Sequence, residues 1–75
     1  ADPKIIRPLA ETLGLTSAET DLVELLVNGS TLARAAQRLG RSRNTARNQL
    51  ASAMSKANVG RQADLVRLFA HSGPA

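Results

Sequence analysis

Residues 42–58 alternate between apolar and polar side chains with the period of an α-helix. The apolar side chains recur every three or four residues and fall on one side of this helix: Ala46, Leu50, Ala53, Met54 and Ala57. The opposite side has no acidic residue and no large apolar one, and it consists of Asn44, Arg47, Asn48, Ala51 and Ser55, with Ser52 at its edge. Amides, guanidinium groups and small hydroxyls are side chains that contact base edges and phosphates in a DNA groove. This face is therefore a candidate DNA-binding surface, and the alternative is an amphipathic helix whose polar face meets only solvent.

A shorter helix is predicted before this stretch, and it begins with the capping box Thr16-Ser17-Ala18-Glu19. In such a box the Thr16 hydroxyl accepts a hydrogen bond from the backbone N–H of Glu19, and the Glu19 carboxylate accepts one from the backbone N–H of Thr16. The buried stripe of the helix is predicted to be Ala18, Leu22, Leu25 and Leu26. The helix should run to about Val27, where Asn28-Gly29 ends it.

The next helix is predicted from about Leu32 to Leu39, with Ser30 or Thr31 as its N-cap. Its outward residues are predicted to be Arg34, Gln37 and Arg38. Gly40 ends this helix and leaves a very short connection to Ser42, the predicted N-cap of the helix over 42–58. Two helices joined by a few residues that include glycine form the helix-turn-helix pattern, in which the second helix enters the DNA major groove and the first lies across the backbone.

Residues 1–14 are predicted to form an N-terminal arm with one short helix, from Pro8 in its first turn to Leu13 before Gly14. Its apolar side chains would dock onto the main core: Ile5, Ile6, Leu9, Leu13 and Leu15. We favour an ordered arm that only covers apolar surface, and the alternative is a linker from an upstream domain.

A last helix is predicted from about Arg61 to His71, followed by a frayed tail over 72–75. It has two apolar lines on nearly opposite sides, Ala63, Val66 and Ala70 on one and Leu65, Leu68 and Phe69 on the other. Because a terminal helix of so short a chain cannot easily bury both, we expect Leu65, Leu68 and Phe69 to form a dimerisation surface. The alternative is that Leu65 and Phe69 cover neighbouring loops.

The charge of the chain is +4, and its placement favours a polyanionic partner. No acidic residue lies between Leu25 and Ala63. The same span contains the basic residues Arg34, Arg38, Arg41, Arg43, Arg47, Lys56 and Arg61. A membrane surface is a weaker candidate for the polyanion, because the basic helix over 42–58 has no Trp or Phe to insert.

No residue pattern indicates catalysis or a bound cofactor. The 75 residues allow one small domain, and without cysteine there is no disulfide or thiolate metal site. The one histidine, His71, lies near the chain end, and no metal-ligand spacing or phosphate-binding glycine loop is present. We therefore expect a protein that is not an enzyme and has no catalytic residue, no metal and no cofactor.

Three segments over residues 15–71 resemble, in order and spacing, the LuxR-type (GerE-like) helix-turn-helix domain of bacterial transcription regulators. LTSAETDLVELLVNG resembles the opening of that domain, AAQRLGRSRNTARNQL its central part and NVGRQADLVRL its last turn and helix. The chain departs from the family pattern at Ala46 for Val, Gln49 for His, Arg41 for an aliphatic residue and Asn58 for Gly. The resemblance implies an all-α, four-helix domain with an additional N-terminal helix or arm.

The resemblance also implies a cytoplasmic, nucleoid-associated output domain that binds a palindromic double-stranded DNA site as a homodimer through its last helix. With the third helix of the domain, over 42–58, in the major groove, the candidate DNA-binding residues are Ser42, Arg43, Asn44, Thr45, Arg47, Asn48, Gln49, Arg34, Arg38, Arg41 and Lys56. RNA polymerase is a further candidate partner, and no membrane is expected. Two alternatives remain: a module of the same shape that docks on RNA polymerase or another regulator, and DNA-binding region 4 of a sigma factor.

Overall fold

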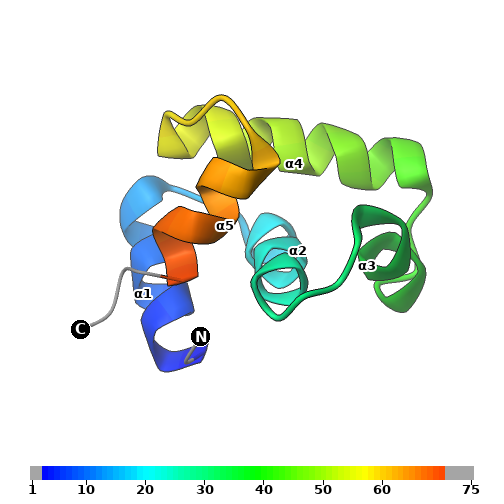
Figure 1. Cartoon of the computed structure of the whole chain (residues 1–75), viewed down its shortest axis with the longest axis horizontal. Helices are drawn as coiled ribbons and strands as arrows, with labels where there is room; N and C mark the ends of the chain where they lie inside the picture. Colours follow the sequence, from blue (N-terminus) through cyan, green and yellow to red (C-terminus); the bar gives the residue numbers. More distant parts are fainter. Residues whose placement is uncertain (1–2, 71–75) are drawn as a thin grey trace.

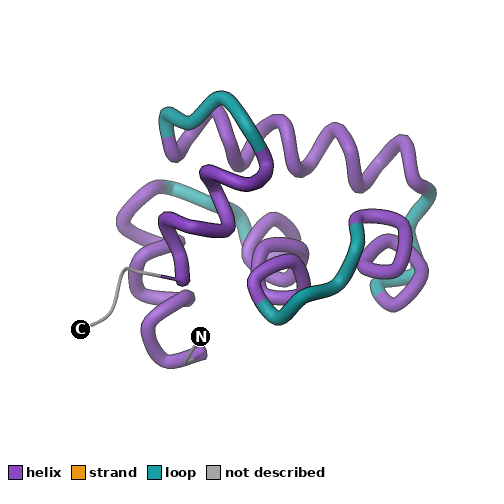
Figure 2. Tube along the Cα trace, viewed as in Figure 1, coloured by secondary structure: helices purple, strands orange, loops and turns teal. Residues whose placement is uncertain are grey.

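A computed structural model describes residues 3–70 of the chain, with side chains from residue 6 onward. These residues form five α-helices joined by short turns, and the described range contains no strand (Figures 1 and 2). The helices are α1 (Pro3–Leu13), α2 (Ser17–Val27), α3 (Leu32–Arg38), α4 (Arg43–Ala57) and α5 (Gln62–Ala70). The all-α class predicted from the sequence is therefore confirmed. Across the described residues, none of the helices combines the length and apolar character that a membrane crossing needs.

Helix α2 is the centre of the fold, because it contacts each of the other four helices. Helix α4 lies across one side of the molecule, with α3 packed near its start (Figure 1). Helices α1 and α5 contact each other at the opposite end, although they come from opposite ends of the chain. This arrangement leaves one long side of α4 uncovered.

The helix starts follow the local capping signals of the sequence. The Thr16 hydroxyl accepts from the Glu19 N–H at 3.1 Å, and the Glu19 carboxylate accepts from the Thr16 N–H at 2.9 Å, which confirms the capping box. Thr31 caps α3 and Ser42 caps α4 through the same kind of side-chain acceptor. Helix α4 ends at Asn58, whose backbone is left-handed (φ 57°), a common conformation for the residue that ends a helix.

Helix α1 is longer than the sequence predicted, because it begins at Pro3 and holds Pro8 in its interior. Proline removes one hydrogen bond from a helix and clashes with the preceding turn, which is why the helix was expected to start at Pro8. Burial of Ile6 and Ala10, both 0% exposed, offsets that penalty. The side chain of Ile5 lies outside the described residues.

Two ion pairs fasten α1 to α2. The guanidinium of Arg7 lies 2.8 Å from Asp21 through Nη2 and 2.8 Å from Glu24 through Nε. The arm over residues 1–14 is therefore packed against the rest of the fold along its described length.

Helix α5 turns inward the same face that was expected to be a partner surface. Leu65 is 0% exposed and Phe69 is 1% exposed, and Leu68 packs against the same core. They are buried because α1 and α2 both contact α5 and cover this side. The expectation that Leu65, Leu68 and Phe69 face a second copy is therefore corrected, since these side chains belong to the core of the chain itself. His71 and residues 72–75 lie outside the described residues.

Candidate nucleic-acid interface

The uncovered side of α4 consists of polar and small side chains. Asn44, Arg47, Asn48, Ala51 and Ser55 are all exposed, as the helical period predicted. The opposite side is in the core, where Ala46, Leu50 and Ala53 are buried. The apolar residues thus fix which face of α4 points outward, and that face presents one guanidinium, two amides and a hydroxyl without any neighbouring apolar anchor.

The start of α4 offers a second group of hydrogen-bond donors. The Ser42 hydroxyl oxygen accepts from the Thr45 N–H at 3.1 Å and lies 2.9 Å from the Thr45 hydroxyl. The N–H groups of Arg43 and Asn44 have no acceptor within the helix, so they point out of the helix start. Together with the positive end of the helix dipole and the exposed Arg43 side chain, they form a position that suits a phosphate.

Helix α3 contributes basic side chains next to this start. Arg34 and Arg38 are both exposed, and neither forms an ion pair within residues 6–70. The two positions differ, because Arg38 borders a shallow pocket that Asp21 and Glu24 also line. The two carboxylates near Arg38 carry two negative charges against the single positive charge of Arg7, so Arg34 is the better placed of the two for an anionic ligand.

Arg41 and Gln49, both predicted to contact DNA, contact each other in the structure. Arg41 is half-buried in the turn between α3 and α4. Its Nη1 donates to Gln49 Oε1 at 2.7 Å and to the backbone carbonyl of Ala18 at 3.1 Å. In the structure these two side chains join α4 to the first turn of α2.

Lys56 is also engaged within the protein. Its Nζ lies 2.7 Å from Glu19 Oε1, and the Glu19 side chain is only 7% exposed. Burial by itself would raise the pKa of Glu19, but hydrogen bonds from Lys56, Ser52 and the Thr16 backbone outweigh it and lower the pKa to about 2. The charge of Lys56 is thus balanced by a carboxylate, so its expected role in attracting DNA is weakened.

The exposed cations of the span from Leu25 to Ala63 that form no ion pair in the described range are consequently five arginines: Arg34, Arg38, Arg43, Arg47 and Arg61. None of them forms an ion pair within residues 6–70, where the ion pairs belong to Arg7 and Lys56. Sequence reasoning found the acid-free span but missed that Arg41 and Lys56 are held internally. Their acceptors lie 23 and 37 residues away, beyond any local pattern.

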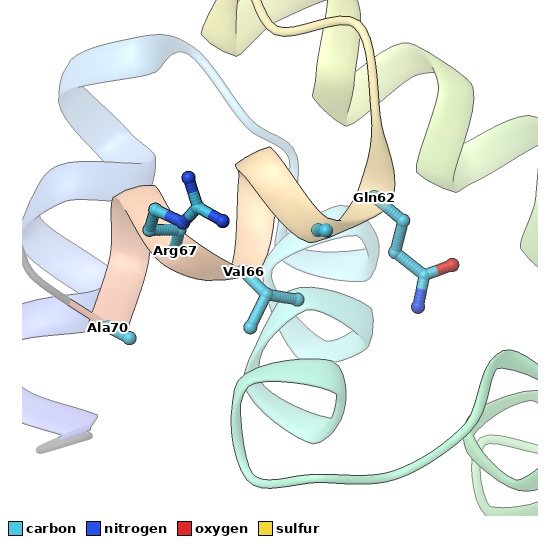
Figure 3. Close-up of a pocket in the computed structure, with 5 residues that line it drawn as sticks. Gln62, Val66, Arg67 and Ala70 are labelled. Carbon is cyan, nitrogen blue, oxygen red and sulfur yellow. The ribbon is translucent and has the colours of Figure 1, made fainter.

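A separate apolar surface lies on the outer side of α5. Gln62, Ala63, Val66, Arg67 and Ala70 line a shallow, open pocket there, which Figure 3 shows in close-up. Val66 is half-buried, whereas Ala63 and Ala70 are exposed. This surface contains the apolar line of Ala63, Val66 and Ala70 that the helical period predicted.

No cluster of histidine, cysteine, aspartate or glutamate in the described part of the chain could hold a metal ion. Comparisons with protein-family models, with curated proteins and with solved structures find no match for this chain. The interpretation of the interface therefore depends on its own geometry and charge.

Proposed function

We propose that this chain is a sequence-specific double-stranded DNA-binding domain of helix-turn-helix type, with α4 as its recognition helix. One observation carries the proposal: the uncovered face of α4 has amide, guanidinium and hydroxyl side chains with no acid and no apolar anchor, and three arginines on α3 and α4 are exposed and form no ion pair within residues 6–70. These are Arg34, Arg43 and Arg47. A protein-docking face would instead be expected to present a Trp, Tyr or similar anchor at its centre.

The arrangement of α3 and α4 supports this function in two ways. Helix α4 has 15 residues and is therefore about 22 Å long, and an α-helix of ordinary width fits the major groove. Helix α3 precedes it after a turn over residues 39–42 and packs against it, so its exposed Arg34 suits a backbone phosphate. In this proposal Arg47 and Asn48 contact base edges, and Asn44 contacts a base at the edge of the site. Phosphate is bound at the start of α4 by Ser42, Arg43 and Thr45.

We further propose that the domain is the output domain of a bacterial transcription regulator of LuxR type, acting in the cytoplasm on the nucleoid. The resemblance of residues 15–71 supports this, as do the order of α2 to α5 and the capping box at the start of α2. Dimerisation on a palindromic site is part of the proposal. Its surface is revised to Ala63, Val66 and Ala70, because Leu65 and Phe69 are in the core.

The proposal is tested by selection of the protein's binding sites from a random pool of duplex DNA at two salt concentrations. We expect an enriched, roughly palindromic motif and an affinity that falls steeply with salt, because phosphate binding releases counterions. Salt-sensitive binding without a motif would contradict sequence-specific recognition. Absence of DNA binding at low salt would contradict the whole proposal and favour a protein partner.

Arg47→Ala tests the proposed base contact on the selected site. We expect a loss of about 1–3 kcal/mol in binding free energy on that site, with relaxed preference at one base pair and little change on random DNA. Arg61→Ala is the matched control, since Arg61 is an exposed arginine outside α4. An equal loss on selected and random DNA would assign Arg47 to a phosphate instead.

A further inference from the structure

Arg41 lies where three elements of the fold meet. It belongs to the turn between α3 and α4, and its side chain reaches the first turn of α2 and the middle of α4. The amino group Nη1 carries two hydrogens, and the structure directs one to the Ala18 carbonyl and the other to Gln49 Oε1. Both hydrogens of that group are therefore used inside the protein.

The two acceptors make this side chain a bridge between α2 and α4. Helix α2 contacts every other helix, so it is the fixed body against which α4 is positioned. The buried alanines and Leu50 of α4 supply contact area but few directional constraints, because small side chains can slide and rotate on an apolar surface. A charged hydrogen bond of 2.7 Å to Gln49 adds such a constraint on the flank of α4, next to its exposed face.

We propose that Arg41 is a positioning residue of the DNA interface, which sets sequence discrimination through Gln49 and contacts no DNA itself. The proposal depends on the DNA-binding function proposed above. By holding Gln49 Oε1, Arg41 fixes the rotation of α4 about its axis and hence the angle at which Arg47 and Asn48 meet the base edges. Loss of the bridge loosens that rotation in the first half of α4, because the Lys56–Glu19 pair then remains as the charged link to α2 and lies near the far end of the helix. Arg47 and Asn48 themselves are not removed.

The competing role for Arg41 is a phosphate contact through its remaining N–H groups. The salt dependence of the DNA affinity distinguishes a phosphate contact from a positioning role. A phosphate contact adds about one to the slope of log affinity against log salt, whereas a positioning residue does not. The variants are Arg41→Met, Gln49→Met and the double variant. Each single substitution keeps an unbranched apolar side chain at its position and removes one end of the bridge. Arg43→Met is the matched control for an exposed neighbouring arginine.

Each variant is measured on the site selected by the unmodified protein and on a scrambled duplex, over a series of salt concentrations, and its own motif is selected from the random pool. We expect Arg41→Met to lower the ratio of selected to scrambled affinity about tenfold, the size of one hydrogen bond to a charged group, with the salt slope unchanged. Gln49→Met should give a similar loss with the same altered base preferences, and the double variant should be no worse than either. Arg43→Met should instead reduce the salt slope by about one.

The proposal is overturned if Arg41→Met reduces both affinities equally together with the salt slope, or if it leaves the selected motif unchanged. Far-UV circular dichroism and thermal melting verify that each variant folds. Should Arg41→Met not fold, Gln49→Met decides the question through the salt slope and the motif, because it leaves the Arg41 bond to Ala18 in place. Failure of the unmodified protein to select any motif would overturn the proposed function itself, which is a distinct outcome.

Discussion

The carboxylate of Glu19 joins two helices at a single residue. It closes the capping box of α2 through the Thr16 N–H and pairs with Lys56 near the end of α4. A capping carboxylate is usually solvated, whereas this one is nearly buried. The same atom, Oε1, serves both contacts, so protonation of the carboxyl group would weaken both together.

Stability should therefore depend on pH through Glu19. Its pKa falls from 4.5 to about 2 on folding, so the contribution is fully present above pH 4.5 and is lost as pH falls from there toward about 2. A shift of this size corresponds to about 3 kcal/mol of unfolding free energy. Urea unfolding followed between pH 6 and pH 2 measures the loss.

Glu19→Gln should flatten this dependence, since Gln can still complete the capping box but does not titrate. Glu11→Gln, at an exposed position of α1, is the control and should leave the pH dependence intact. A Glu19→Gln protein with the same acid sensitivity as the unmodified chain would show that another carboxylate is responsible.

Asn58 is the second residue with a specific effect, because its backbone lies in the left-handed region. A residue with a Cβ is strained there, and glycine is not, although asparagine tolerates the conformation better than most. Asn58→Gly should raise the unfolding free energy by about 0.5 kcal/mol, measured by thermal or urea unfolding. Gly40 also has a left-handed backbone, at φ 67°, so adding a Cβ there in Gly40→Ala should lower the unfolding free energy by about 1 kcal/mol. A loss of stability in Asn58→Gly would contradict the argument.

At the scale of the helix, α1 contains the clearest conflict between local preference and tertiary packing. Proline in a helix interior costs about 3 kcal/mol relative to alanine, partly offset because proline also restricts the unfolded chain. Pro8 is exposed, so no packing is lost on its removal. Pro8→Ala should therefore raise the unfolding free energy by about 1–2 kcal/mol and the helical circular dichroism signal slightly. An unchanged or lower stability would show that the α1 backbone is bent to suit the proline.

Helix boundaries could be predicted wherever the signal is local. Thr16, Ser42 and Asn58 each mark a helix end in their own neighbourhood, and the structure has all three as caps. For α3 the sequence left Ser30 and Thr31 open, and the cap is Thr31. Helix α1 was misjudged because its interior proline is a strong local signal that burial of Ile6 overrides. Local patterns thus predict the helix boundaries, except where contacts with a helix distant in the sequence determine where a helix begins.

The inward face of α5 could not be predicted for the same reason. Both faces have helical spacing, so periodicity alone gives no preference between Leu65 with Phe69 and Val66 with Ala70. Contacts with α1 and α2 determine which face of α5 is buried, and α1 is separated from α5 by most of the chain. The internal contacts of Arg41 and Lys56 likewise depend on partners that are far away in the sequence, at 23 and 37 residues for Ala18 and Glu19.

For the molecule as a whole, the revised outer face of α5 leads to a prediction about assembly on DNA. Val66 lies at the centre of the apolar line on this face and is only half-buried. Val66→Glu should leave the fold intact and place two charges in the proposed dimer contact. Affinity for a site with two half-sites should then fall on the order of 100-fold toward that of a single half-site.

The measurement compares one-half-site and two-half-site duplexes for the variant and the unmodified protein. Arg67→Glu, at the margin of the same surface, is the control for an added acid near DNA. If both variants lower the affinity for one and two half-sites alike, the effect is electrostatic and α5 is not the dimer contact.

The uncovered face of α4 is also separate from the network of contacts that holds the fold. Asn44, Arg47, Asn48, Ala51 and Ser55 are exposed, and their side chains form no hydrogen bond or ion pair with the rest of the described chain. Most combinations without proline or glycine at these five positions should consequently keep the same fold, since other residues differ by less than about 1 kcal/mol each at an exposed helix position. If the proposed function holds, a library randomised there would vary in the DNA site it recognises while its members share one scaffold.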